Sequence, residues 1–255
     1  MQHDLNVNLS GRICLVSGAS AGIGLQLCGR LAEAGADVVA VGRNTAGLQD
    51  AADRVRSVGR TCWTIEADLS SSEDTDRVVK EALEQAGTVD VLVNNAGVSV
   101  NHPLTEESIT DWERTLAVNL RAPWLLARGF APNMIARKRG KVINVSSLAA
   151  GIGMENHGSY TASKSGLNGL TKVMTAEWAP HNIQSNAICP TVTLTPMAEQ
   201  VWGDPAKLGP MVAKIPAGRV AQPVEVCDVV LFLASTASDM INGETIFIDG
   251  GYTAL

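Results

Sequence analysis

The sequence predicts a single α/β domain with a doubly wound, mostly parallel seven-stranded sheet and helices on both faces. Two observations favour this fold class: short apolar stretches alternate with helix-like stretches, and a glycine-rich turn follows the first apolar stretch. Parallel strands need long crossover connections, and helices usually supply them on both faces of the sheet. A chain of 255 residues is long enough to bury a substantial core in one such domain.

The expected strands are short and rich in apolar residues. They cover residues 12–17, 37–41, 62–65, 89–93, 141–145, 183–188 and 245–248. Helices are expected at 23–33, 112–134 and 159–178. The chain shows no linker or repeat, so residues 1–255 should form one dinucleotide-binding and catalytic domain. Residues 190–216 are rich in Pro, Thr and Gly and are expected to be a mobile segment that covers the substrate.

Composition narrows the function classes. A net charge of −6 argues against binding nucleic acid or an anionic membrane through bulk charge, and small-molecule chemistry fits better. No apolar run approaches the ~20 residues that span a bilayer, and residues 1–10 lack the features of a secretion signal, so a cytoplasmic location is expected. The five cysteines are scattered without C-x-x-C spacing, which predicts no metal site and no disulfide framework.

The turn after the first expected strand reads Ser17-Gly18-Ala19-Ser20-Ala21-Gly22-Ile23-Gly24, a G-x-x-x-G-x-G spacing. Glycines at such a turn let the backbone approach a pyrophosphate and bring the helix N-terminus to its negative charge. Gly18, Ser20, Ile23 and Gly24 are therefore expected to contact a dinucleotide. The alternative is a tight strand-to-helix turn without such a function.

The second expected strand bears on which nucleotide is bound. It ends in Gly42-Arg43-Asn44 and carries no carboxylate that could accept hydrogen bonds from the ribose of NAD. Arg43 could instead pair with the 2′-phosphate of NADP. NADP(H) is the preferred cofactor and NAD(H) the alternative, because Arg43 could also be an ordinary surface arginine. Asn44, the next residue, is also expected to contact the cofactor.

Two later loops complete the expected nucleotide site. Asp68-Leu69 follows the third expected strand, where the carboxylate could accept from the adenine amino group or cap a helix. Asn95-Ala96-Gly97 follows the fourth, at the carboxyl edge where open α/β sheets bind ligands. A loop that only turns the chain is the alternative there.

Tyr160 and Lys164 lie four residues apart in an expected helix, so their side chains should project from one face. A free tyrosine titrates near pH ~10, and a fixed cation beside it favours the phenolate and lowers the pKa. The pair is therefore a candidate acid/base device. An exposed tyrosine beside a surface lysine is the alternative for an isolated Y-x-x-x-K.

With these motifs in this order, and a serine after the fifth expected strand, the chain resembles the short-chain dehydrogenase/reductases over nearly its whole length. The resemblance implies a Rossmann-like fold, hydride transfer between NAD(P)(H) and a carbonyl or secondary alcohol, and commonly a homotetramer. By position it implies the catalytic set Asn119, Ser147, Tyr160 and Lys164. It also implies that the segment with Pro190, Val192 and Thr195 contacts the nicotinamide carboxamide.

Asn119 has independent support from Pro123. A proline in a helix lacks an amide proton and clashes with the carbonyl four residues earlier, which here belongs to Asn119. A kink at this point would free that carbonyl to hold a water, which is the relay role that the family implies. Helix distortion without a function is the alternative.

The substrate is expected to be a ketose, a polyol or a small dicarbonyl, because Asn156-His157, Pro190-Thr191-Val192 and Trp202-Gly203-Asp204-Pro205 resemble dicarbonyl/L-xylulose reductases and sugar dehydrogenases. Expected substrate contacts are Ser147, Leu148, His157, Tyr160 and Trp202. Leu148 departs from the polar residue of the xylulose reductases, and His157 and Trp202 could be purely structural. A 3-oxoacyl carrier protein reductase and a nonenzymatic dinucleotide-binding regulator are the alternative functions.

Overall fold

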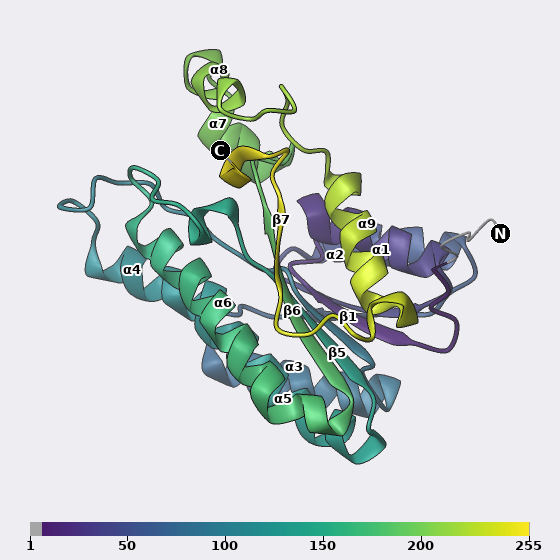
Figure 1. The fold of residues 1–255 in the computed structure, drawn as a ribbon. Coiled ribbons are helices and arrows are strands. Elements are labelled where there is room, and N and C mark those ends of the chain that lie inside the picture. The colour runs from purple at the N-terminus through teal and green to yellow at the C-terminus, as the bar shows by residue number, and fades with distance from the viewer. Residues whose placement is uncertain (1–6, 255) are drawn as a thin grey trace.

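The computed structural model describes residues 7–254 and has a seven-stranded sheet in the order β3-β2-β1-β4-β5-β6-β7 (Figure 1). Each pairing within this sheet is parallel, which confirms the predicted fold class. The strands are β1 (Ile13–Ser17), β2 (Asp37–Gly42), β3 (Cys62–Glu66), β4 (Val91–Asn94), β5 (Gly140–Val145), β6 (Ile183–Pro190) and β7 (Thr245–Ile248). All seven expected strands are present, with ends that differ by up to two residues.

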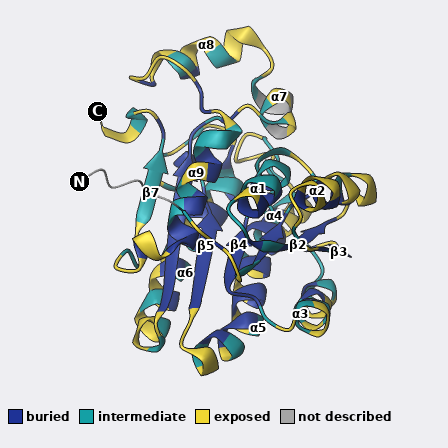
Figure 2. Cartoon of the chain, turned by 90° about the vertical axis from the view of Figure 1, so that its right-hand side faces the viewer, coloured by how far each residue is buried: buried dark blue, intermediate teal, exposed yellow. Residues whose placement is uncertain are grey.

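Helices cover both faces of the sheet. One face carries α1 (Gly22–Glu33), α2 (Thr45–Ser57) and α9 (Pro223–Ala234), and the other carries α3 (Ser72–Ala86), α5 (Ala122–Arg137) and α6 (Gly158–Trp178). Neighbouring residues of one strand pack into different hydrophobic cores: Val16 lies in the core under α1 and α9, and Leu15 lies in the core under α3 and α5. Figure 2 shows the central strands buried and the outer helix faces exposed.

The strand order places a ligand crevice at one edge of the sheet. The chain moves outward from β1 through β2 to β3, and then returns to the other side of β1 with β4. The loops after β1 and β4 therefore separate at their carboxyl ends, where open α/β sheets bind ligands. Above this edge in Figure 1 lie α7 (Pro196–Trp202) and α8 (Pro205–Ala213). The segment expected to cover the substrate thus contains two short helices.

The helix expected over residues 112–134 is interrupted. It consists of α4 (Ile109–Leu116), a π-helical turn (Ala117–Arg121) and α5. The amide of Ala122 donates to the carbonyl of Ala117, five residues earlier instead of four. Pro123 follows directly and has no amide proton to continue the α-helical ladder. The predicted distortion beside Asn119 is therefore present, although the freed Asn119 carbonyl stays a prediction.

In the part of the chain that the structure describes, no helix is both long and apolar enough to cross a bilayer. Residues 7–254 also contain no cluster of three or more His, Cys, Asp or Glu side chains that could hold a metal ion. The five cysteines are buried and unpaired with one another.

Candidate active site

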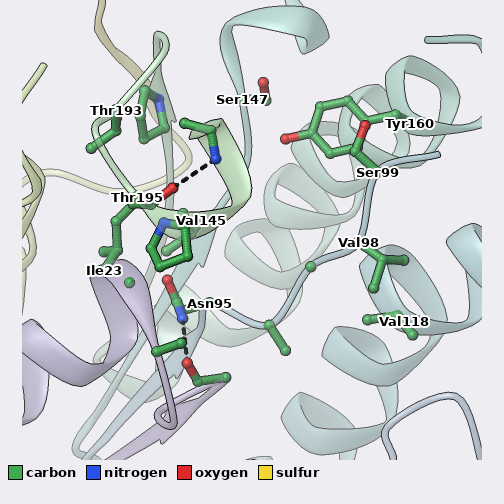
Figure 3. Close-up of a pocket in the computed structure, with 18 of the residues that line it drawn as sticks. Ile23, Asn95, Val98, Ser99, Val118, Val145, Ser147, Tyr160, Thr193 and Thr195 are labelled. Atoms are coloured by element: carbon green, nitrogen blue, oxygen red, sulfur yellow. Dashed lines mark hydrogen bonds between the residues drawn. The ribbon is translucent and has the colours of Figure 1, made fainter. Parts of the chain in front are cut away.

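A cavity of about 440 Å³ opens at the carboxyl edge of the sheet (Figure 3). Most residues expected at the site line it: Gly18, Ser20, Ile23, Arg43, Asn44, Asp68, Leu69, Asn95, Ala96, Gly97, Ser147, Leu148, His157, Tyr160, Lys164, Pro190, Val192, Thr195 and Trp202. Two expected residues, Gly24 and Asn119, are not among its lining residues and lie behind its walls.

The glycine-rich turn is shaped by close backbone contacts. Gly18 has φ +69°, and a Cβ there would lie 2.9 Å from the Cα of Ala96. A Cβ on Gly24 would overlap the carbonyl oxygen of Gly18. Only glycine fits these two positions without moving backbone atoms. Gly24 therefore acts by letting α1 pack on the turn, and it does not itself face the cavity.

Ser17 joins the glycine-rich turn to the loop after β4. Its hydroxyl accepts from the amides of Asn95 (3.0 Å) and Ala96 (3.1 Å) and lies 3.4 Å from the carbonyl of Val93. The side-chain amide of Asn95 donates back to the carbonyls of Ser17 (2.9 Å) and Gly18 (3.3 Å). The Asn95 side chain is thus used to hold the two loops together. The motif spacing alone does not reveal this function of Ser17.

Polar residues from the ends of β2 and β3 form one end of the cavity. The side chain of Asn44 accepts from the amide of Gly47 at 2.8 Å and caps α2. Asp68 accepts from the amide of Ser70, and this hydrogen bond, aided by the charge of Arg43, lowers the pKa of Asp68. The cap of α3 is Ser71, so the capping alternative for Asp68 is wrong.

Ser147, Tyr160 and Lys164 meet at the other end of the cavity. Figure 3 shows the hydroxyl of Tyr160, from α6, directed toward Ser147, which follows β5. Lys164 is 3% exposed; its Nζ donates to the carbonyl of Val145 at 2.8 Å and lies 5.8 Å from the centroid of the Tyr160 ring. The helical spacing therefore brings the two side chains into one site, as predicted.

The protonation of this pair differs from the expectation. Burial raises the pKa of Tyr160, while its hydrogen bond to Ser147 acts in the opposite direction. The expected lowering of the Tyr160 pKa is therefore wrong for the protein alone, because burial outweighs the opposing hydrogen bond to Ser147. Burial also lowers the pKa of Lys164 to about 8.

Asn119 is fully buried behind the catalytic end. Its Oδ1 accepts from the amide of Val98 at 2.9 Å, and its Nδ2 donates to the carbonyl of Val98 and to the hydroxyl of Ser163. These contacts occupy both ends of the side-chain amide. A catalytic function of Asn119 would therefore have to use its main chain.

The chain is similar in sequence to known reductases and dehydrogenases. The family model described as "Enoyl-(Acyl carrier protein) reductase" matches residues 18–253. The chain is 41% identical to L-xylulose reductase of Bos taurus over 251 residues, 98% of this chain and 100% of that protein. It is 36% identical to D-threitol dehydrogenase of Mycolicibacterium smegmatis over 256 residues, 98% of this chain and 96% of that one.

A solved structure is similar over a comparable length. Gluconate 5-dehydrogenase from Burkholderia cenocepacia, in complex with NADP and tartrate, superposes with a TM-score of 0.93 at 36% identity and covers 98% of both chains. The chain belongs to the short-chain dehydrogenase/reductase family. This short-chain dehydrogenase/reductase is an NAD(P)-dependent oxidoreductase acting on CH–OH groups, near the polyol and sugar dehydrogenases.

The cavity of this dehydrogenase/reductase fits a dinucleotide. Its lining continues from Arg43 and Asp68, past the glycine-rich turn, to Tyr160 and Lys164. Thr191 also lines it, and the Thr191 hydroxyl is buried without a hydrogen-bond partner among the described residues. An unsatisfied buried hydroxyl is costly, and a bound amide or hydroxyl group would satisfy it. The Thr195 hydroxyl, by contrast, already caps α7 by accepting from Ala198 at 3.2 Å.

Several lining residues escaped the sequence analysis. Val98 and Ser99 come from the loop after β4, Met154 from the loop before α6, and Met211 from α8. None of these four residues belongs to a motif with a known function. They line the same cavity as Leu148, His157 and Trp202 only because of the fold, and their positions in the sequence do not predict this.

Proposed function

We propose that this enzyme interconverts a ketone and a secondary alcohol on an uncharged, hydroxylated substrate, a ketose or polyol, with NADP(H) as its preferred cofactor. The observation that carries the proposal is the charge pattern of the cavity. Its charged lining residues are Arg43, Asp68 and Lys164, and the first two lie at the nucleotide end. At the catalytic end, Lys164 is the one lysine or arginine among the described lining residues.

Lys164 is a poor counter-ion for a substrate carboxylate. Its ammonium is buried and donates to the carbonyl of Val145, and burial lowers its pKa to about 8. The walls nearby include Leu148, Met154 and Trp202. A carboxylate desolvated there without a cation of its own would lose several kcal/mol of binding energy. The cavity therefore favours a neutral sugar or polyol over a sugar acid.

His157 supports a hydroxylated substrate. Its Nδ1 lies 2.6 Å from the carbonyl oxygen of Glu155, so Nδ1 carries the proton in the neutral ring, and Nε2 is left as an acceptor. The ring centroid lies 6.0 Å from that of Tyr160. A substrate hydroxyl next to the reacting carbon could donate to Nε2. Small dicarbonyl compounds, which lack such a hydroxyl, should be poorer substrates.

The cofactor preference rests on the end of β2. Gly42 is its last residue, and Arg43 lines the cavity directly after it. A guanidinium there can pair with a 2′-phosphate, whereas the ribose hydroxyls of NAD would need a carboxylate. Gly18, Ser20 and Ile23 would hold the pyrophosphate, Asp68 the adenine, and Asn95, Ala96 and Gly97 the central ribose region. Pro190, Val192 and Thr195 would contact the carboxamide.

The protein's own groups fit a proton donor beside the reacting carbonyl. The raised pKa of Tyr160 keeps its phenol protonated at neutral pH, so the phenol can donate to the developing alkoxide. Ser147 would stabilise the same oxygen. Lys164 would orient the nicotinamide ribose, and the main chain of Asn119 would hold a relay water. When bound, the reduced cofactor supplies the hydride.

The test is a substrate panel assayed with NADPH and NADH. Neutral ketoses should give a kcat/KM about 100-fold above keto acids of the same chain length, from the missing counter-ion. Tyr160→Phe should abolish turnover while retaining NADPH binding. Faster turnover of the acids would refute the neutral-substrate proposal, and unchanged turnover by Tyr160→Phe would refute the catalytic assignment. Preferential turnover of carrier-bound 3-oxoacyl groups would favour the alternative reductase.

We also propose that the enzyme is a homotetramer located in the cytoplasm and that it binds no nucleic acid. Within each subunit, we propose that residues 190–216 move over the substrate. Support for assembly comes from apolar side chains exposed on α4, α5 and α6: Ile109 on α4 is 78% exposed, Trp124 on α5 43% and Val173 on α6 51%. Burying them between subunits would remove apolar surface from water. A monomer in light scattering at assay concentration would contradict the tetramer.

A further inference from the structure

A second cavity, of about 540 Å³, lies at the amino ends of the strands, on the edge of the sheet away from the catalytic cavity. In Figure 1 the turn from α5 to β5 and the start of β6 lie at the bottom, while α7 and α8 lie at the top. Its charged lining residues are Arg12, Arg137, Lys138, Arg139, Lys141 and Asp239. The catalytic mechanism uses none of them.

The cavity carries an excess of positive charge. Five cations line it, and the carboxylates that they meet are Asp90 and Asp239, which leaves an excess of three positive charges. Lys141 pairs with Asp239 at 2.8 Å, and Arg137 pairs with Asp90 at 2.7 Å. The whole chain has a net charge of −6, so this local excess is opposite in sign to the rest of the molecule.

Asp90 makes a hydrogen bond to only one of the guanidinium groups that line the cavity. One of its oxygens accepts from the amide of Ile13 at 2.9 Å, and the other accepts from Arg137. Arg139 stays 3.7 Å from that second oxygen, beyond hydrogen-bond distance. Arg12, which is half-buried, makes no ion pair with any residue in the described part of the chain.

Arg12 and Arg139 carry like charges on the lining of the same cavity. Burial is the first cause that lowers the pKa of Arg12, and the positive charge of Arg139 is the second. A bound anion would relieve both effects, because it replaces lost hydration and separates the like charges. Guanidinium groups bind planar or tetrahedral oxyanions through paired N–H donors.

We propose that this cavity binds a phosphate group, free or as a small phosphate ester, between Arg12 and Arg139, with Lys138 as a third cation. Such a ligand would join the start of β1 to the end of α5, which are far apart in the sequence. The site is independent of the proposed function, since it lies at the opposite edge of the sheet. Its occupancy stabilises the fold and leaves the catalytic groups untouched.

The experiment compares melting temperatures in sodium phosphate and in sodium chloride of equal ionic strength. At a phosphate concentration of ~100 Kd, we expect a rise of about 5 °C over chloride. Arg12→Gln/Arg139→Gln should lose this rise and keep the kcat of the parent enzyme. Arg54→Gln/Lys80→Gln, which removes the same charge from exposed faces of α2 and α3, should retain the rise.

The cofactor cavity also attracts phosphate, so Arg43→Gln serves as a second control. A rise that disappears in Arg43→Gln but persists in Arg12→Gln/Arg139→Gln would overturn the proposal, as would equal melting temperatures in phosphate and chloride. If the double variant is unstable in chloride, isothermal titration with inorganic phosphate and with glycerol phosphate at low temperature measures affinity directly. There we expect at least a tenfold loss, and unchanged affinity for both ligands would refute the site.

Discussion

We expect Lys164 to lower the stability of the folded protein, although the proposed function assigns it a place in the active site. It is 3% exposed, and it forms no ion pair with any residue that the structure describes. Burial lowers its pKa from 10.5 to about 8. At about 1.4 kcal/mol for each pH unit, this fall corresponds to about 3 kcal/mol of stability lost when the protonated lysine is buried.

Lys164→Met keeps the length of the side chain and removes the charge. We expect the variant to be more stable at pH 7 by about 2 kcal/mol, because the lost hydrogen bond to the Val145 carbonyl offsets about 1 kcal/mol of the gain. Its kcat should fall by roughly 100-fold or more if Lys164 takes part in the proton transfer. Stability and activity would then change in opposite directions.

The pH dependence has a definite sign. The folded pKa of Lys164 lies below its unfolded value, so the unfolded chain binds more protons between pH 8 and 10.5. The penalty is therefore fully present below pH 8, and it disappears as the pH rises through that window. The stability difference between Lys164→Met and the parent should shrink accordingly, and should reverse near pH 10.5, where only the lost hydrogen bond remains.

Urea unfolding at pH 6.5, 8 and 10 measures these differences. Lys141→Met is the control for a buried lysine with a carboxylate partner: Lys141 is also 3% exposed and burial lowers its pKa, but it pairs with Asp239 and donates to Ser238. Any gain in stability at pH 7 should therefore be smaller for Lys141→Met than for Lys164→Met. Lys80→Met is the control for exposed lysine on α3 and should have little effect. The reasoning would be refuted if Lys164→Met were less stable than the parent at pH 6.5. It would also be refuted if the difference in unfolding free energy between the two did not change with pH.

Three further predictions concern the nucleotide end. Arg43→Ala should raise the KM for NADPH by about 10- to 100-fold, because charged hydrogen bonds to the 2′-phosphate are lost. The KM for NADH should stay nearly unchanged. Equal effects on both cofactors would contradict the 2′-phosphate contact. Gly24→Ala should destabilise by about 1–3 kcal/mol in urea because its Cβ overlaps Gly18, whereas Gly29→Ala, with its nearest contact 3.8 Å away, should not destabilise. Ser17→Ala should lower urea stability by about 1–3 kcal/mol through the orphaned amides of the β4 loop, and Ser17→Thr should restore it; equal losses in both would argue against the hydroxyl.

The strands and the nucleotide turn could be predicted because their signals are local. Buried parallel strands appear as short apolar runs, and a close backbone approach requires glycine wherever a Cβ would overlap, as at Gly24. The helices α7 and α8 were not predicted, because the Pro, Thr and Gly residues in 190–216 favoured a mobile segment. Each of these short helices instead starts at a proline, Pro196 and Pro205, where the missing amide proton does no harm.

The error at Tyr160 has a different origin. Sequence spacing correctly brought Tyr160 and Lys164 together, but the sign of a pKa shift depends on how burial and charge compete. Burial opposes both the phenolate on Tyr160 and the ammonium on Lys164, so it raises the pKa of the tyrosine and lowers that of the lysine to about 8, which moves the two values apart. The same desolvation that makes the pair unfavourable for stability keeps the phenol a proton donor. The depth of the site, which only the fold determines, therefore sets the protonation of the two groups in the proposed acid/base device.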